Sequence, residues 1–393
     1  MPHQSGTRQG VTLILLSMLP ILAIAGLVAD LPVLLEVFRN TAQHELLVPM
    51  VLTLPSLCVA LFSSVAGIIA DRWGRRPLLL LALAGFSLLG LLPLLFSSLA
   101  AVLASRVLVG LAEASILTCT NTLWGDYFPE DTRRRWLGFQ QMFGPVSNAL
   151  LALAGGGLAA HHWSSPFWLY LLGLPALLLA GLYLHEPATQ APAAITATVP
   201  TVAVSQAGFP WPVARRIAAV TLGVSIVFFM LAIQQGRVFA ALGVDSPAVS
   251  GQLIMLVSLA AILGAACFNA LRQRPVAQLL SLGLACYGIS YVGIWSAGSV
   301  TAGAVASALG QFASSIVLPA LIAWTLSSMS PAHRGRGAGL WGAVFFAGQF
   351  VSAPLLSGLE HLTASLGNAF GVVGIAALIA AFIALWTHKE ERV

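Results

Sequence analysis

The sequence predicts an all-α membrane protein with twelve transmembrane helices. Its composition, its long apolar runs and the placement of its basic residues carry this prediction. Hydrophobic residues make up 58% of the 393 residues and charged residues only 8%, whereas ordinary soluble domains are about 25% charged. The apolar runs approach the roughly 20 residues that a helix needs to cross a bilayer core. They are continuous and lack period-two alternation, which excludes a transmembrane β-barrel.

Twelve apolar runs are expected to form the membrane-spanning helices. They lie at residues 11–35, 46–70, 77–96, 99–122, 137–160, 167–184, 215–239, 248–270, 276–296, 299–326, 337–358 and 367–387. The first run, with Arg8 before it, also resembles a secretory signal. Its removal would leave an odd number of spans and spoil the symmetry described below, so we expect it to be retained as the first helix.

Basic residues are divided very unequally between the two sets of alternate loops. One set, together with both termini, holds 15 of the 18 lysines and arginines, and the other holds only Arg39; Arg106 and Arg237 lie within helices. Loops that face the cytoplasm carry such an excess. We therefore expect a bacterial inner-membrane protein with both termini in the cytoplasm. These loops also explain the net charge of +5, which argues against a nucleic-acid partner.

The chain is expected to consist of two similar halves. Residues 185–214 are rich in Ala, Thr, Pro and Val and are interpreted as a cytoplasmic linker between six-helix halves at 1–184 and 215–393. At a constant offset of 202 residues, Ala104-Ser105 recurs as Ala306-Ser307, Pro129 as Pro331 and Gly156 as Gly358. Parallel repeats of this kind occur in transporters, so a pseudo-twofold relation between the halves is expected.

The loop after the second predicted helix carries a specific motif. It reads Gly67-Ile-Ile-Ala-Asp71-Arg72-Trp-Gly74-Arg75-Arg76 and resembles the G-x-x-x-D-R-x-G-R-R signature of the major facilitator superfamily. The resemblance covers the whole chain, is closest to bacterial drug–proton antiporters, and implies alternating access to a central site. Ser147-Asn148 stand where the antiporter signature has paired glycines, which weakens the prediction of antiport.

The resemblance implies a gating role for this motif. Asp71 is expected to meet the helix that begins near Gly337 when the cytoplasmic side closes, because a helix N-terminus attracts a carboxylate. Gly67 is expected to permit a close helix approach. The resemblance implies that the nearby arginines of the motif take part in the same contact on the cytoplasmic side. The alternative is that these charges only enforce topology.

Three ionisable side chains lie within predicted helices of the first half. Glu113 is near mid-membrane, Arg106 lies two turns away on the same face, and Asp30 lies near the outer end of the first helix, where it could pair with Arg106. A charge at the bilayer centre costs at least about 2.5–3.5 kcal/mol, so all three are candidates for proton or substrate coupling. Burial disfavours the charged form of a carboxylic acid, which suits Glu113 as a proton carrier. The alternatives are a protonated Glu113 that only bonds helices together, and an Asp30 that only reaches interfacial water.

The second half offers amides in place of acids. Gln234, Gln235 and Gln311 are candidates for lining the cavity, since the resemblance places the first, fourth, seventh and tenth helices around it. The alternative is hydrogen bonding between helices. The four cysteines form no C-x-x-C and the histidines lie in tails, loops or helix ends, so no metal or cofactor is expected.

The sequence thus predicts a monomeric secondary transporter that exports a drug-like or metabolite molecule in exchange for protons. No Walker A sequence is present, so ATP is not expected to drive it. The alternatives are proton symport or facilitated uptake, and a transport-inactive receptor. An enzyme is not expected, because the one acidic cluster, Asp126, Glu130 and Asp131, adjoins arginines and is interpreted as a loop ion-pair network. Substrate identity, direction and stoichiometry stay open.

Overall fold

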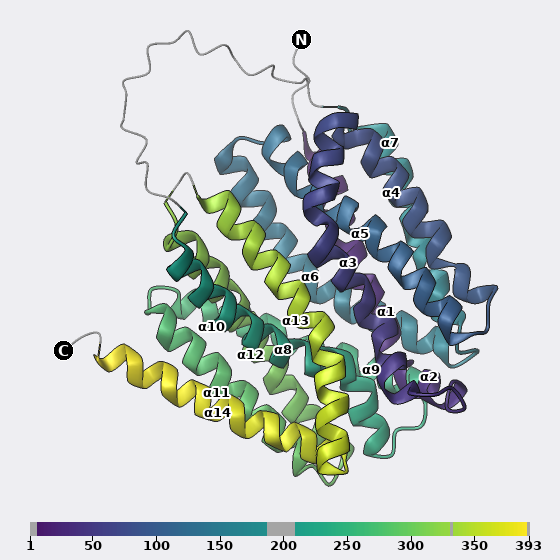
Figure 1. Ribbon diagram of the computed structural model, residues 1–393, viewed down its shortest axis with the longest axis vertical. Helices are drawn as coiled ribbons and strands as arrows, with labels where there is room; N and C mark the ends of the chain where they lie inside the picture. Colours follow the sequence, from purple (N-terminus) through teal and green to yellow (C-terminus); the bar gives the residue numbers. More distant parts are fainter. Residues whose placement is uncertain (1–5, 187–208, 331–332, 391–393) are drawn as a thin grey trace.

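The computed structural model describes residues 6–186, 209–330 and 333–390. Within these ranges it contains helices and no strands, and twelve helical segments are long and apolar enough to cross a membrane. The expected all-α fold is therefore confirmed. The first half (purple to blue) lies to the right in Figure 1 and the second half (teal to yellow) to the left and below.

Each half supplies six of these segments. The first half contains α1 (Thr7–Val28) with α2 (Leu31–Val37), α3 (His44–Trp73), α4 (Arg75–Gly90) with the 3-10 turn η1 (Leu92–Leu94), α5 (Leu99–Tyr127), α6 (Glu130–Ala159), and the 3-10 helix η2 (Ser165–Leu172) with α7 (Gly173–Tyr183). The second half contains α8 (Trp211–Ala241), α9 (Pro247–Ser258) with α10 (Ala260–Leu271), α11 (Val276–Trp295), α12 (Val300–Ser327), α13 (Arg334–Thr363) and α14 (Leu366–Glu390).

Four predicted helices are interrupted in the structure. The predicted helix at 167–184 changes from the 3-10 helix η2 to α7 at Gly173, whereas Pro32 and Pro93 lie in the first turns of α2 and η1. Proline lacks the N–H that continues a helix, so the chain restarts at these two prolines. The fourth interruption, at Leu259 between α9 and α10, has no proline or glycine beside it, and the local sequence does not explain it.

The fifth span begins earlier than predicted, at Glu130 instead of residue 137. Glu130 and Asp131 lie in the first turn of α6, where carboxylates favour the positive end of the helix dipole. The expectation that these acids belong to a loop is therefore wrong. The expected linker at 185–214 falls largely on residues 187–208, outside the described residues. Its boundaries stay a prediction.

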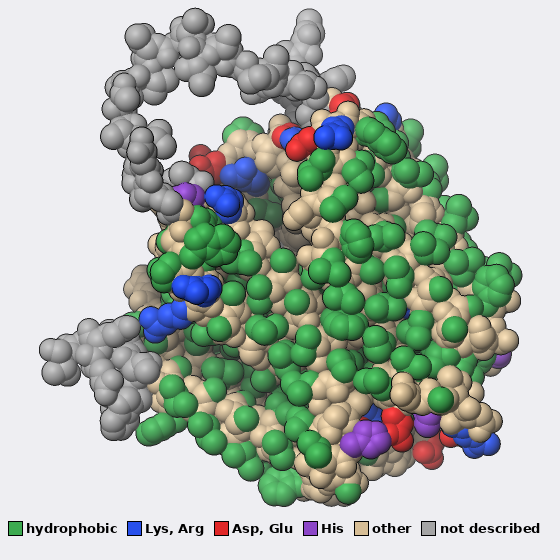
Figure 2. Space-filling view, viewed as in Figure 1, with side chains coloured by type: hydrophobic (Ala, Val, Ile, Leu, Met, Phe, Trp, Pro, Cys, Tyr) green, Lys and Arg blue, Asp and Glu red, His purple; other side chains and the backbone are tan. Residues whose placement is uncertain are grey.

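The two ends of the molecule differ in charge. In Figure 2, lysines and arginines with some acids among them lie at the top and along the left side, acids and histidines with a few basic atoms lie at the lower right, and a mostly uncharged belt lies between them. We call the first the basic end; it contains residues 72–76 and the starts of α8 and α13. We call the other the opposite end; it contains α2 and the loop between α8 and α9.

The halves touch through glycines at the opposite end. A Cβ atom on Gly156 of α6 would lie 2.4 Å from the carbonyl oxygen of Pro247 and 2.9 Å from Gly251 Cα in α9. A Cβ atom on Gly236 of α8 would lie 2.2 Å from the carbonyl oxygen of Val28 in α1. Small residues allow membrane helices to approach this closely. The backbones of the two halves are thus in contact at this end.

Polar contacts reinforce the closed end between α3 and α13. The Ser357 hydroxyl donates to the Glu45 carbonyl oxygen at 3.1 Å, and His361 Nε2 lies 3.2 Å from the Glu45 carboxylate. Both side chains of the second pair are exposed, so it contributes little on its own.

The basic end is open between the halves. Gly138 and Gly144 in α6, and Gly339 and Gly342 in α13, have no atom within 4 Å of an added Cβ. Figure 2 shows the surface hollowed at the top, between charged groups of the two halves. The molecule is therefore closed at the opposite end and open at the basic end.

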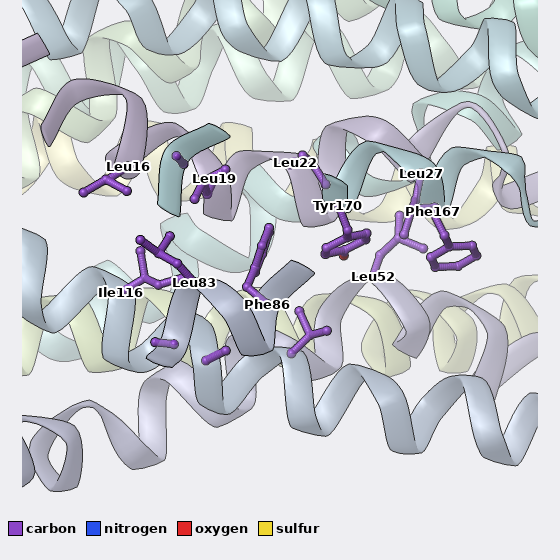
Figure 3. Close-up of a cluster of buried hydrophobic side chains, with 14 of the residues drawn as sticks. Leu16, Leu19, Leu22, Leu27, Leu52, Leu83, Phe86, Ile116, Phe167 and Tyr170 are labelled. Carbon is purple, nitrogen blue, oxygen red and sulfur yellow. The ribbon is translucent and has the colours of Figure 1, made fainter. Parts of the chain in front are cut away.

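The largest apolar cluster takes most of its residues from α1, α3, α4, α5 and η2 of the first half and extends to residues of α8 and α9 in the second half. Figure 3 shows Phe86, Phe167 and Tyr170 beside leucines such as Leu27 and Leu83. Phe86 packs on Tyr170 with ring centroids 4.9 Å apart. This cluster fixes α5, the helix that carries Glu113, against its neighbours.

We expect Gly156→Val to weaken the closed end, because its new side chain would collide with the backbone of α9. Overpacking of this kind costs about 1–3 kcal/mol, so alkylation of a cysteine at the buried position Ser250 should accelerate by roughly tenfold or more. The measurement uses a background in which the four native cysteines are replaced by alanine. Gly157→Val is the matched control, since nothing lies within 4 Å of a Cβ there. Equal labelling of the two variants would contradict this account of closure.

Candidate functional site

Glu113 lies at the middle of α5, where two long helices cross closely. Ser98 caps the start of α5 by accepting a hydrogen bond from the Ala101 amide at 3.3 Å. A Cβ on Gly110 would lie 2.7 Å from both Pro55 Cα and Cys58 Cβ of α3. Glu113 follows one turn later on the same side of α5, and the crossing therefore holds it deep within the first half.

The Glu113 carboxyl is buried without a counter-charge. The residue is 3% exposed, and within the described residues its Oε1 has no hydrogen-bond partner and no ion pair reaches it. The charge of Arg106 acts on it from beyond ion-pair distance. A carboxylate in this position is strongly disfavoured unless a proton, a cation or water compensates it. Glu113 thus has the environment of a group that binds a proton or a cation.

Two further buried polar groups lie on the same face of α5 as Glu113, between Glu113 and the basic end. Thr120 and Trp124 are 1% and 2% exposed, and in the described part of the chain the Thr120 hydroxyl and the Trp124 Nε1 have no hydrogen-bond partner. Thr120 is two turns, or about 10 Å, along the axis from Glu113. These two groups were not predicted, although the i, i+7 spacing of Glu113 and Thr120 is visible in the sequence.

Arg106 has all its observed partners within the first half. Its guanidinium donates to the Tyr170 hydroxyl at 2.6 Å and to the Gly90 carbonyl oxygen at 3.2 Å. It also lies 4.8 Å from the ring centroids of both Phe167 and Tyr170. Because these partners come from α4 and η2, Arg106 ties three elements together. The expected pair with Asp30 does not form.

Asp30 lies at the break between α1 and α2. It is 0% exposed, and neither carboxylate oxygen has a hydrogen-bond partner among the described residues. A side chain buried to this extent does not reach interfacial water in this conformation, so that interpretation is wrong. Asp30 and Glu113 are thus the two buried acids of the first half that lack a counter-charge.

The loop that carries the motif at residues 67–76 is built around Gly74. This residue ends α3, begins α4 and has φ +95°, a conformation that disfavours any residue with a Cβ. The Glu186 carboxylate accepts hydrogen bonds from the Arg75 and Arg76 backbone amides, both at 2.8 Å. A carboxylate at a helix N-terminus satisfies otherwise free N–H groups. Glu186 therefore caps α4.

The arginine side chains of the motif bind within the first half. Arg75 pairs with Asp126 at the end of α5. Arg76 donates to the Leu184 carbonyl oxygen at 2.8 Å and to the Gly181 carbonyl oxygen at 2.9 Å, at the end of α7. The motif thus joins α4 to α5 and α7.

Asp71 and Arg72 are exposed, and Asp71 makes no hydrogen bond to α13 in the described structure. That is the arrangement expected while the basic end is open. The α13 helix begins at Arg334, one turn before the predicted start. The expected close approach at Gly67 is absent from this conformation, since a Cβ there would lie at ordinary contact distance, 3.8 Å from Thr118 Cγ2.

The candidate amides differ in their surroundings. Gln234 and Gln235 are each 1% exposed, and their Nε2 atoms have no partner in the described part of the chain. Arg237 donates to Gln234 Oε1 at 3.5 Å and to the Glu360 carboxylate of α13 at 2.8 and 3.0 Å. Gln311 is only half-buried. The Arg237–Glu360 pair was not predicted, because the predicted helix at 337–358 ends before Glu360.

An aromatic cluster occupies the middle of the second half. Phe345 of α13 lies 6.0 Å from Phe228 and 5.0 Å from Phe229 of α8, between ring centroids. Trp341 stacks on Phe345 at 5.1 Å, and within the described residues its buried Nε1 has no hydrogen-bond partner. The cluster was not predicted, although the adjacent phenylalanines and the i, i+4 spacing of Trp341 and Phe345 were signals. Like Glu113, it lies near mid-helix.

Known sequences similar to this chain include efflux and resistance proteins. The multidrug efflux pump LfrA of Mycolicibacterium smegmatis is 32% identical over 178 residues, covering 44% of this chain and 34% of LfrA. The class H tetracycline resistance protein of Pasteurella multocida is 26% identical over 158 residues, covering 38% of each chain. The match thus spans only about a third of the length of these relatives.

Solved transporters share the fold over nearly the whole chain. The nucleoside transporter NupG superposes with a TM-score of 0.74 at 11% identity, covering 96% of this chain and 99% of NupG. A D-xylose–proton symporter superposes with a TM-score of 0.74 at 13% identity, covering 96% and 95%. A sequence profile described as Major Facilitator Superfamily matches residues 13–275, about two thirds of the chain. The protein therefore belongs to the major facilitator superfamily.

Proposed function

We propose that this protein exports a small, partly apolar organic solute across a bacterial inner membrane in exchange for protons. The observation that carries the proposal is the Glu113 carboxyl, buried at mid-membrane without a hydrogen-bond partner on Oε1 or a salt bridge in the described structure. A buried acid of this kind in a transporter fold marks a proton or ion pathway. The names of the two relatives, an efflux pump and a tetracycline resistance protein, support the direction.

The basic end is the cytoplasmic end in this proposal, because positive residues are retained on that side. The described conformation is then open to the cytoplasm and closed to the outside. Alternating access requires a second state in which the glycine contacts between α6 and α9 separate and the basic end closes. In that state the Asp71 carboxylate reaches the N-terminus of α13.

The proton cycle follows from the cost of a buried charge. Glu113 releases its proton to water that enters from the cytoplasmic side past Thr120, whose hydroxyl both donates and accepts hydrogen bonds, and the resulting carboxylate is stabilised when a solute binds. The protein then opens outward, Glu113 takes a proton from that side, and the neutral acid no longer retains the solute. Protons thus move inward as solute moves outward. No ATP, metal or cofactor takes part, and a single chain suffices.

The aromatic cluster of Phe228, Phe229, Trp341 and Phe345 provides the apolar part of the solute site. Aromatic side chains supply large apolar contact area and attract cations through their faces. With Glu113 on the facing half, the site suits a planar or aromatic molecule that carries a polar or cationic group. The amides Gln234, Gln235 and Gln311 orient the polar parts of such a molecule.

We expect Glu113→Gln to abolish proton-coupled export. Everted membrane vesicles with an acidic lumen and a pH-sensitive dye report proton efflux when candidate solutes are added. Solute-evoked dequenching in the wild type should fall to background in the variant, because the amide cannot carry a proton. Asp30→Asn, with the same chemical change at the other unpaired acid, is the comparison.

The outcomes of this assay separate the alternatives. Dequenching that survives in Glu113→Gln but fails in Asp30→Asn would transfer the proton role to Asp30. Solute-evoked acidification of the lumen would indicate symport in place of antiport. A folded wild type that responds to no solute in a broad panel would contradict the proposed export.

Truncating the aromatic cluster should weaken solute binding and leave folding intact. We expect Phe345→Ala to raise the half-saturating solute concentration by about tenfold, equivalent to the loss of about 1.4 kcal/mol. Dose–response curves in the same vesicle assay measure the shift. Phe96→Ala is the control, since Phe96 is 51% exposed at the end of a helix segment. Equal curves for the wild type and Phe345→Ala would remove this cluster from the solute site.

The gating role of Asp71 has its own test. We expect Asp71→Asn to slow transport by roughly tenfold, since a neutral amide interacts less with the N-terminus of α13. A hydrophilic maleimide added from the cytoplasmic side should also label a cysteine at Gly342 faster, because the open state becomes more populated. If the motif only enforced topology, neither quantity would change, because the variant keeps every positive charge.

A further inference from the structure

A cleft of about 360 Å³ lies between the two halves at the opposite end. One wall is α2 of the first half, and the other is the end of α8 with the loop and first turn of α9. In Figure 1 α2 and α9 lie next to each other at the lower right. The volume falls within the range of about 300–1,000 Å³ that small-molecule sites occupy. It is separate from the mid-membrane region that contains Glu113.

The walls of the cleft are mainly apolar. Pro32, Val33 and Val37 line one side, and Val244 and Pro247 line the other. The charged side chains of the lining are both acids, one from each half: Glu36 on α2 and Asp245 in the loop before α9. Such a lining favours a ligand with an apolar body and a positive charge.

The two acids are neutralised to different extents. Glu36 pairs with Arg39 one helical turn away, and both side chains are exposed. Within the described residues Asp245 has no ion pair, so its carboxylate is an uncompensated negative charge beside the apolar walls. A divalent metal fits this arrangement poorly, because calcium takes six to eight oxygen ligands, and the described residues contain no group of three or more metal-ligating side chains.

We propose that this cleft binds an organic monocation with an apolar body, such as a quaternary ammonium compound, through Asp245 and Glu36. The site is independent of the proposed transport activity, since it lies outside the closed seam and uses other residues. Because its lining comes from both halves, the complete site exists only while this end is closed. A ligand that binds one state better shifts the equilibrium toward it. The bound cation therefore stabilises the conformation described here.

The test measures binding of benzyltrimethylammonium to the purified, full-length protein by isothermal titration calorimetry. We expect Asp245→Asn to weaken binding by about tenfold and Glu36→Gln by about threefold, since Arg39 already compensates Glu36. Asp245 is exposed on a loop, so its variant should keep the wild-type elution profile. Glu45→Gln is the matched control, because it removes one negative charge from the same end and Glu45 does not line the cleft.

The possible outcomes decide the proposal. Selective loss in Asp245→Asn with unchanged binding in Glu45→Gln and Glu113→Gln supports it. Equal weakening by Asp245→Asn and Glu45→Gln would show general surface attraction and overturn it. Loss in Glu113→Gln alone would place the cation at mid-membrane and also overturn it. A second readout is a cysteine at Gly342, which does not line the cleft: its labelling by a hydrophilic maleimide from the cytoplasmic side should accelerate at least twofold when the site is saturated, and unchanged labelling would overturn the stabilising effect.

Discussion

The contact between backbones at the closed end is the constraint on which the rest of the structure depends. Lipid tails are as apolar as apolar side chains, so moving such side chains from lipid into a helix contact gains little free energy. Close van der Waals packing must therefore hold membrane helices together. Gly156 and Gly251, and Gly236 with the Val28 carbonyl, provide that packing between the halves. Because these close contacts lie toward the opposite end, the basic end is hollow and Asp71 is exposed. The cleft beside α2 is a further result of the same closure.

A second principle separates structural from functional charges on α5. Arg106 and Glu113 are two turns apart and both are buried. Arg106 has donor contacts to Tyr170 and Gly90 and two aromatic rings beside it, so its burial is compensated within the first half. In the described structure Glu113 has no comparable partner. An uncompensated group persists in a membrane protein when its function requires it, and we base the proton pathway on this contrast.

The sequence predicted the elements of this fold well because the relevant signals are local. Apolar runs located every span, and the run at 248–270 appears as α9 and α10. The distribution of basic residues predicted which loops lie at the same end of the molecule. Breaks at Pro32 and Pro93 were missed, although the principle that proline interrupts a helix was available.

The candidate site was predicted less completely, because partners of buried groups depend on tertiary packing. Glu113 and Asp30 were identifiable as acids in apolar runs. No local pattern shows that Arg106 is satisfied by Tyr170, more than 60 positions away, or that Arg237 pairs with Glu360 on α13. The same holds for the aromatic cluster, whose members lie on two helices, and for the cleft, whose two acids belong to different halves.

The central claim is alternating access around the glycine contacts. Distances between pairs of spin labels, measured by pulsed electron paramagnetic resonance, test it most directly. One spin-label pair would join Val37 and Val249 at the opposite end, and the other Trp73 and Gly339 at the basic end. Both pairs would be measured in membranes of the full-length protein at several pH values, with and without a transported solute. The account predicts that one distance lengthens whenever the other shortens. Two distances that change together, or a closed end that never separates, would contradict it.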